Sequence, residues 1–190
     1  MIVHELPLAG LFLITEEPRH DSRGYFSRFF CVDELSDAVG EKLRFEQGNV
    51  SFSRQKATIR GLHLQIPPHS ETKLVRCISG RVLDFAVDLR SDSKTKGQYF
   101  PQELSAGDGQ ALLIPVGFAH GFLTLEDNSV LEYLVTEGYS PESERTLSWK
   151  DPTIGLRLPI QPRIWSEKDE CGASFEKLEL ESQVHGWWRV

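Results

Sequence analysis

The feature that most constrains the fold is an alternation of apolar and polar residues with a period of two. In the segment RVLDFAVDLR, residues 81–90, large apolar side chains occupy every second position. Successive side chains of a β-strand point to opposite faces of a sheet, whereas an amphipathic helix needs a period of 3.6. The segment therefore predicts an antiparallel strand with one buried face and one solvent face, on which Asp84 and Asp88 would lie.

Similar short segments recur along the chain and are separated by turn residues. They are KLVRCISG (73–80), QALLIPVG (110–117), GFLTL (121–125) and VLEYLVTEGY (130–139). Many short strands with such turns predict a mainly β protein, built as a sandwich or barrel. One internal helix is predicted over residues 32–39, VDELSDAV, with Gly40 as its end. The tail after Pro162 is expected to hold short helical or irregular pieces.

The composition is that of a soluble globular protein, and we expect a single domain over residues 1–190. The chain is 39% hydrophobic and 26% charged, near the average for such domains. Its net charge of -7 argues against binding nucleic acid or anionic lipid, which both need a surplus of Lys and Arg. No apolar run reaches the roughly 18 residues of a membrane span, and the N-terminus lacks a signal-peptide pattern. We therefore expect no membrane partner and a cytoplasmic location.

The three cysteines, Cys31, Cys77 and Cys171, are widely spaced and form no CxxC pair. Neither a disulfide framework nor a cysteine zinc site is indicated by that spacing. We expect all three to be buried thiols.

Residues 60–82, RGLHLQIPPHSETKLVRCISGRV, place His63, Lys73 and three arginines on predicted strands. Cations in a sheet are costly to bury unless a partner or a ligand compensates for their lost hydration. Because the protein is acidic overall, a local basic cluster that binds an anion is the simplest explanation. For Arg76, a long side chain that reaches the surface explains the sequence equally well.

Two motifs resemble the signatures of the cupin superfamily, whose fold is a small antiparallel jelly roll, also called a double-stranded β-helix. The second signature is matched in GQALLIPVGFAHGF by Gly109, Pro115, Gly117 and His120. The first signature normally supplies two histidines and a glutamate as metal ligands, and the matching residues here are His63, Gln65 and Lys73. Two of the four expected ligands are missing, and one is replaced by a cation that repels a divalent ion. The resemblance implies a cupin without a metal.

At a finer level the chain resembles the dTDP-4-dehydrorhamnose 3,5-epimerase family, from about residue 2 to about residue 169. The segments that carry the resemblance are DSRGYF, FEQGNVSFS, IRGLHLQ, KLVRCISGRVLDFAVDLR, LLIPVGFAHGFLTLED, EYLVTEGYSPESE, LSWKDPTIGL and SEKD. It implies one cupin-type jelly-roll domain with a few short helices, N-terminal dimerisation strands and a short C-terminal extension. It also implies a cofactor-free isomerase that inverts carbons beside the ketone of a nucleotide-linked 4-keto-6-deoxyhexose. The expected assembly is a homodimer that exchanges N-terminal strands.

The resemblance implies roles for four catalytic residues. His63 is the expected base for the proton α to the ketone, because imidazole titrates near neutral pH, and Asp169 would orient it. Lys73 would meet the negative charge that develops on the C4 oxygen. Tyr133 would deliver the new proton, since inversion needs an acid on the opposite face of the sugar ring. From the residues alone, an exposed loop for Asp169 and a core position for Tyr133 are open alternatives.

The same match implies a set of substrate-binding residues, namely Arg23, Phe26, Arg28, Gln47, Asn49, Arg60, Lys73, His120, Tyr139, Glu144 and Lys168. Arginine suits a diphosphate because its planar group donates two parallel hydrogen bonds. Phe26 and Tyr139 are the expected aromatics for stacking on the base, with ordinary core packing as the alternative. Two positions depart from the family pattern. Arg28 stands where a glutamate near the base is usual, which exchanges acceptors for donors, and Leu64 stands where an aromatic is common.

Several alternatives stay open. A cupin that binds a sugar nucleotide without catalysis would not need His63, Asp169 and Tyr133 together, and a metal-dependent oxygenase is disfavoured by Gln65 and Lys73. A 3,4-ketoisomerase resembles these motifs less well. The expected conversion is of the type dTDP-4-dehydro-6-deoxy-D-glucose to dTDP-4-dehydro-L-rhamnose, with a CDP- or GDP-linked sugar as the alternative. The motifs leave open whether C3, C5 or both are inverted.

Overall fold

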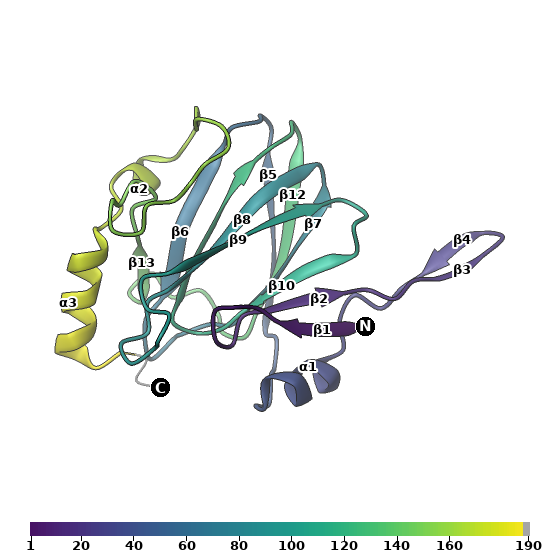
Figure 1. Ribbon diagram of the computed structural model, residues 1–190, viewed down its shortest axis with the longest axis horizontal. Helices are drawn as coiled ribbons and strands as arrows, with labels where there is room; N and C mark the ends of the chain where they lie inside the picture. Colours follow the sequence, from purple (N-terminus) through teal and green to yellow (C-terminus); the bar gives the residue numbers. More distant parts are fainter. Residues whose placement is uncertain (188–190) are drawn as a thin grey trace.

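The computed structural model describes residues 1–187 as two antiparallel β-sheets packed face to face (Figure 1). In spatial order, the six-stranded sheet contains β1 (Ile2–Glu5), β2 (Phe12–Thr15), β10 (Gln110–Ile114), β7 (Lys73–Ser79), β12 (Ser129–Val135) and β5 (Gln47–Ser53). The five-stranded sheet contains β13 (Glu144–Thr146), β6 (Ile59–Gln65), β11 (Phe118–Thr124), β8 (Arg81–Asp88) and β9 (Tyr99–Ser105). This arrangement confirms the predicted mainly β, jelly-roll architecture.

The strand and helix predictions also hold at the level of individual segments. The predicted strand segments correspond to β7, β8, β10, β11 and β12. The predicted helix is α1 (Val32–Val39), and it ends at Gly40, whose φ of 74° lies in the left-handed region that glycine adopts without strain. The tail contains two short helices, α2 (Glu167–Glu170) and α3 (Phe175–His185).

The space between the two sheets is filled by apolar side chains. Val75 on β7 and Leu131 on β12 face Val82 and Ala86 on β8, and all four are fully excluded from solvent. On the outside of the six-stranded sheet, α1 buries Leu35 in a separate cluster with residues of β2 and β10. Burial of these faces is the main favourable contribution to the stability of the fold.

The outer face of the five-stranded sheet is covered as well. The prediction that the strand over residues 81–90 has one solvent face is therefore wrong. Phe85 and Val87 pack outward against a layer from the C-terminal part of the chain, which includes Leu147 and Leu178. In Figure 1 this part of the chain, coloured green to yellow, lies along β6 and β13. The alternation in β8 is therefore between two buried faces.

The two aspartates of β8 are buried because each has a partner. Asp84 and Asp88 are both 0% exposed. Asp84 contacts His120 on the neighbouring strand, and Asp88 contacts Arg90. A hydrogen-bonding or charged partner lowers the cost of burying a carboxyl group.

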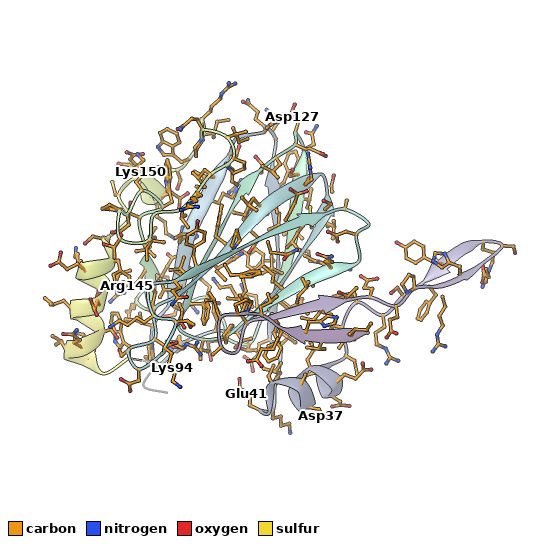
Figure 2. All side chains as sticks on the ribbon, viewed as in Figure 1. Asp37, Glu41, Lys94, Asp127, Arg145 and Lys150 are labelled. Carbon is orange, nitrogen blue, oxygen red and sulfur yellow. The ribbon has the colours of Figure 1, made fainter. Side chains whose placement is uncertain are left out.

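A two-stranded hairpin extends away from both sheets. It consists of β3 (Arg19–Asp21) and β4 (Gly24–Phe26), and Figures 1 and 2 show it projecting beyond the rest of the chain. Its aromatic residues Tyr25 and Phe26 are 63% and 75% exposed. The predicted alternative of ordinary core packing for Phe26 is therefore wrong within this chain.

The prediction of three buried thiols is correct only for Cys77, where burial raises the thiol pKa to about 11. Cys31 is partly exposed and Cys171 is exposed, because they lie at the ends of α1 and α2 on the surface. All three are free thiols. Across residues 1–187, no helix is long and apolar enough to cross a membrane.

Asp88 provides a test of how the buried charges stabilise the fold. Burial by itself would raise the pKa of Asp88, but hydrogen bonds from Arg90, Ser93 and Thr95 outweigh that effect and hold the pKa below its usual range. Its folded-state pKa is depressed, so its stabilising contribution is complete above the usual aspartate pKa near 4 and is lost as pH falls through the folded-state value.

We expect Asp88→Asn to lower the free energy of unfolding by about 3 kcal/mol at pH 7, because it leaves Arg90 without its charged partner. The difference from wild type should shrink below pH 4. Urea unfolding at pH 7 and at pH 3 measures both values, with Asp92→Asn, an exposed aspartate of the same loop, as the control. An unchanged difference at both pH values would contradict this role.

Candidate active site

A pocket of about 650 Å³ opens between the two sheets, where the apolar filling gives way to polar side chains. This volume is within the range of roughly 300 to 1,000 Å³ that is typical of small-molecule sites. The predicted site residues that line it are Gln47, Asn49, Arg60, His63, Lys73, His120, Tyr133, Tyr139, Glu144 and Asp169. The structure thus brings together residues from both sheets and from the C-terminal part of the chain.

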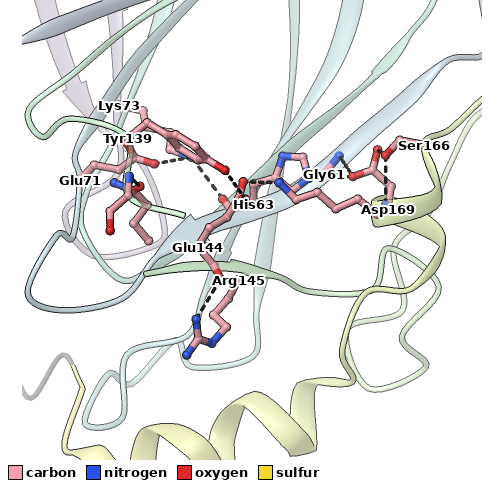
Figure 3. Close-up of polar contacts among 12 residues, drawn as sticks. Gly61, His63, Glu71, Lys73, Tyr139, Glu144, Arg145, Ser166 and Asp169 are labelled. Atoms are coloured by element: carbon pink, nitrogen blue, oxygen red, sulfur yellow. Dashed lines mark hydrogen bonds and ion pairs between the residues drawn. The ribbon is translucent and has the colours of Figure 1, made fainter. Parts of the chain in front are cut away.

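His63 and Asp169 form a hydrogen-bonded pair on one wall of the pocket. His63 points inward from β6, because its neighbours Leu62 and Leu64 take the outward-facing positions in the apolar layer. Its Nε2 lies 2.7 Å from Asp169 Oδ1 (Figure 3). A carboxylate only accepts hydrogen bonds, so Nε2 is the donor in this pair and Nδ1 is the ring nitrogen left without a role in it.

Asp169 is itself held from two further directions. The Ser166 hydroxyl donates to Oδ2 at 2.8 Å, and the Gly61 N–H donates to Oδ1 at 3.2 Å. Burial would raise the pKa of Asp169, but the hydrogen bonds from His63, Ser166 and Gly61 hold it below its usual range. The side chain of Asp169 is therefore a carboxylate at neutral pH. It is 3% exposed, so the alternative of an exposed loop position is excluded.

Two glycines allow β6 and β11 to approach closely beside this pair. A Cβ at Gly61 would lie 2.6 Å from the carbonyl oxygen of His120, and a Cβ at Gly121 would lie 2.5 Å from that of Arg60. Gly61 also has a φ of 104°, which L-residues rarely adopt. Glycine at both positions therefore lets the two strands approach each other closely. The Gly61 N–H donates to Asp169 instead of to the neighbouring strand β11.

Lys73 and Tyr133 come from the opposite sheet. Lys73 on β7 is 6% exposed, and its Nζ donates to the carbonyl oxygen of His63 at 3.2 Å, across the gap between the sheets. Tyr133 on β12 faces the same pocket. Burial, together with the charges of Glu71 and Glu144, raises the pKa of Tyr133 against the opposing effect of Arg60, so the phenol stays protonated at neutral pH.

Arg60 and His120 also lie in the pocket wall. Arg60 donates to Ser53 Oγ at 3.0 Å and to the carbonyl oxygen of Phe52 at 2.8 Å, which fixes it against β5. His120 lies opposite His63 in the β6–β11 register, and its Nε2 is 2.8 Å from Asp84 Oδ2. The other carboxylate oxygen of Asp84 has no hydrogen-bond partner among the described residues.

The rim of the pocket is a connected polar network. The Tyr139 hydroxyl donates to Glu144 at 2.9 Å, and Lys168 also contacts Glu144. Burial would raise the pKa of Glu144, but these two partners hold it below its usual range. Gln47 donates to Asn49 at 2.8 Å and accepts from the backbone of Tyr139. Tyr139 is 59% exposed, which excludes the core-packing alternative for it.

Arg23, Phe26 and Arg28 are not brought to this pocket. They belong to the β3–β4 hairpin and the residues after it, where Arg23 pairs with Asp21 and Arg28 pairs with Glu34. Arg76 and Arg81 from the basic segment also lie elsewhere. Arg76 packs on Phe29 outside the six-stranded sheet, and Arg81 pairs with Glu103 and Glu126.

Gln65 and Lys73 occupy positions where the cupin signature has metal ligands. The Gln65 amide is tied to main-chain groups, since it donates to the carbonyl oxygens of His69 and Gly138 and accepts from the N–H of Ser140. Within residues 1–187, no three His, Cys, Asp or Glu side chains gather as a metal ion would need.

Sequence reasoning missed several residues of the site, chiefly Glu71, Asp84, Trp165 and Ser166. Glu71 precedes Lys73 by two positions, so period-two alternation places both on one face of an extended chain and was a usable signal. Ser166 precedes Asp169 by three positions, the spacing of a helix N-cap, and its Oγ accepts from the Asp169 N–H. For Asp84 and Trp165, no local pattern distinguishes the site from the core.

Comparisons with known proteins agree with this geometry. The family model described as dTDP-4-dehydrorhamnose 3,5-epimerase matches residues 5–177. A protein of that name from Sinorhizobium fredii is 41% identical over 184 residues, which cover 96% of this chain and 94% of that protein.

Solved structures agree as well. The crystal structure of dTDP-4-dehydrorhamnose 3,5-epimerase from Elizabethkingia anophelis superposes with a TM-score of 0.89 and 35% identity, over 93% of this chain and 97% of that one. An epimerase from Legionella pneumophila, in complex with dTDP-4-keto-L-rhamnose, has a TM-score of 0.87 and 34% identity, over 95% of both chains. These matches confirm the resemblance, and the chain belongs to the dTDP-4-dehydrorhamnose 3,5-epimerase family of isomerases.

Proposed function

We propose that the chain is an epimerase that inverts C3, C5 or both in dTDP-4-dehydro-6-deoxy-D-glucose, to give a product of the dTDP-4-dehydro-L-rhamnose type. The observation that carries the proposal is the location of His63 and Tyr133 on different sheets around one pocket. Inversion needs a base and an acid on opposite faces of the sugar ring, and two facing sheets supply opposite walls. The ligand named for the Legionella structure, dTDP-4-keto-L-rhamnose, supports the same substrate class.

In the proposed mechanism, Nδ1 of His63 takes the proton from the carbon beside the ketone. The electrons of that C–H bond form a C=C bond to C4, and the carbonyl electrons move onto the C4 oxygen. Asp169 stabilises the imidazolium through Nε2, and Lys73 donates a hydrogen bond to the enolate oxygen. Tyr133 then gives its proton to the other face of the same carbon as the ketone re-forms. Exchange with solvent returns His63 and Tyr133 to their starting states.

The nucleotide diphosphate is proposed to lie toward Arg60 and His120, whose cationic or donor groups face the pocket from the five-stranded sheet. Gln47, Asn49, Tyr139, Glu144 and Lys168 form the rim, and we propose that they contact the remainder of the substrate. In this arrangement the rim hydrogen bonds hold the side chains in place before the ligand arrives, which lowers the entropy cost of binding.

Arg23, Phe26 and Arg28 are proposed to complete the site of a second copy of the chain in a homodimer. The projecting hairpin supports this, because its aromatic side chains Tyr25 and Phe26 are largely exposed in their own chain. The outer face of the six-stranded sheet also exposes Val50 and Phe52, at 67% and 50%. Exposed apolar side chains on a sheet edge and a hairpin are typical of an interface.

A cytoplasmic location is proposed as well. The support is the three free thiols, one of them exposed, since unpaired cysteines are typical of a reducing compartment.

The two proton transfers can be separated by isotope exchange in heavy water. We expect His63→Asn to abolish deuterium uptake at the inverted carbon while nucleotide binding persists, because the base acts only in the chemical step. Tyr133→Phe should still exchange deuterium through His63 but invert little substrate. NMR of the sugar protons measures both quantities. Normal inversion by Tyr133→Phe would assign the acid to another group.

The nucleobase preference tests the departure at Arg28. We expect the highest kcat/KM with the dTDP-linked sugar, in line with the family to which the chain belongs, and weaker turnover of the CDP- and GDP-linked sugars. Arg28→Glu should change kcat/KM among these substrates more than it changes kcat, because Arg28 is proposed to act in binding the base. Arg44→Glu, an exposed arginine outside the hairpin, is the matched control. Equal preference in wild type would favour the open CDP or GDP alternative.

Mixing two inactive variants tests whether the hairpin acts on the partner. His63→Asn removes the base, and Arg23→Ala with Phe26→Ala removes the hairpin contacts. If the hairpin completes the partner's site, each mixed dimer contains one site with an intact base and an intact hairpin, so activity returns on mixing. If the hairpin serves its own chain, no mixed dimer has an intact site. Turnover after subunit exchange, with sedimentation to measure the oligomeric state, decides between the two.

A further inference from the structure

Glu71 is a carboxylate in the pocket wall to which the proposed mechanism gives no role. It lies two residues before Lys73, the first residue of β7, and both side chains face the pocket. Glu71 Oε1 is 3.1 Å from Lys73 Nζ, and the two side chains are only 13% and 8% exposed (Figure 3). A buried ion pair of this kind is costly to form from solvated groups, so its presence beside the reacting groups calls for a functional explanation.

The backbone directly after Glu71 is anchored. The Thr72 N–H donates to Thr136 Oγ1 at 2.9 Å, and the Thr136 N–H donates to the Thr72 carbonyl at 3.1 Å. These bonds continue the β7–β12 ladder, in which Lys73 pairs with Val135. Glu71 therefore directly precedes a residue that is hydrogen-bonded to the neighbouring strand segment.

The two contacts of Lys73 limit what its ammonium group can do. An ammonium has three N–H donors. One donates to the carbonyl oxygen of His63 at 3.2 Å, and the Glu71 carboxylate lies 3.1 Å from Nζ as an ion pair. These two contacts hold Nζ between Glu71 and His63, and its other N–H groups are available to a ligand.

We propose that Glu71 is a positioning residue for the epimerisation, because its carboxylate holds the Lys73 ammonium at the place from which it donates to the C4 oxygen of the substrate. The inference rests on the proposed role of Lys73. A donor held in place before the charge develops needs no reorganisation during the reaction, which is the condition under which such donors are most effective.

The same carboxylate acts on the proposed acid. Burial is the largest cause that raises the pKa of Tyr133, and the negative charge of Glu71 raises it further. The other charged and titratable groups in the pocket wall are Arg60, His63, Lys73, His120, Tyr139, Glu144 and Asp169. Glu71 thus acts on both sides of the reaction, since it holds a donor for the enolate and contributes to the raised pKa of the phenol.

A double-mutant cycle tests the positioning role. We expect Glu71→Ala to slow deuterium exchange and inversion about tenfold in the wild-type background, within the range for directly coupled neighbours. In the Lys73→Ala background it should have little effect, because there is no ammonium left to hold. Glu71→Gln retains an acceptor of the same shape and should keep most of the rate. Glu137→Gln, a carboxylate outside the pocket that pairs with His69, is the control.

The titration of Tyr133 supplies a second readout that does not depend on turnover. Removing the charge of Glu71 should lower the pKa of Tyr133, so both Glu71→Gln and Glu71→Ala should form the tyrosinate at lower pH than wild type. Absorbance difference spectra against matched Tyr133→Phe proteins isolate this signal. A purely structural role for Glu71 would not shift it in the well-folded Glu71→Gln protein.

The outcomes separate this inference from the proposed function. Equal rate losses from Glu71→Ala in both Lys73 backgrounds, or an unmoved Tyr133 titration, would overturn the role of Glu71 alone. If Lys73→Ala by itself leaves exchange unchanged, the proposed role of Lys73 fails, and the positioning role fails with it. Three results together support the proposed role of Lys73 and the positioning role of Glu71. They are slower exchange in Lys73→Ala, a rate loss from Glu71→Ala that depends on the presence of Lys73, and a lower Tyr133 pKa in the Glu71 variants.

Discussion

The structure depends on the burial of both faces of the five-stranded sheet. Its inner face packs on the six-stranded sheet, and its outer face carries Phe85, Val87 and other large apolar side chains that must also leave water. Within residues 1–187, the C-terminal part of the chain covers them. Its path over that face returns to the edge of β6 in a parallel bridge between Thr58 and Ile164, and α2 follows directly. Asp169 reaches His63 because the chain has to cover that sheet.

The pocket is polar because the inward-facing residues change in kind from one end of the space between the sheets to the other. The apolar side chains between the sheets fill one end of the space, and at the other end the inward positions carry His63, Lys73 and Tyr133. Most of these groups are paired before any ligand binds, as in the contacts of His63 with Asp169, His120 with Asp84 and Lys73 with Glu71. Pairing lowers the cost of burying charge, and it also holds each group in a defined direction. A lysine at the place of a metal ligand is compatible with this arrangement, since it supplies a positive charge in its own right.

The hairpin with Tyr25 and Phe26 and the outer face of β5 expose apolar side chains outside these cores. A single chain has no further segment among the described residues to cover them. The proposed homodimer would bury such surfaces and bring Arg23 and Arg28 to a pocket that their own chain does not let them reach. Substrate recognition would then depend on assembly, whereas the proton-transfer groups come from one chain.

Local sequence determined much of this structure. Period-two alternation and turn residues were sufficient to predict β7, β8, β10, β11 and β12, and a short amphipathic run ending at glycine was sufficient to predict α1. These patterns work because the periodicity of a strand or a helix is set by residues that are close in the chain. Motifs at defined spacing identified the family and nominated His63, Lys73, Tyr133 and Asp169. Tertiary structure alone decided that β8 is buried on both sides, since alternation cannot tell a solvated face from one covered by a distant segment. It also decided that Asp169 lies 2.7 Å from a histidine 106 positions earlier, and that Arg23, Phe26 and Arg28 lie away from their own pocket. Those facts follow from how sheets and segments pack in space, and no spacing along the chain encodes them.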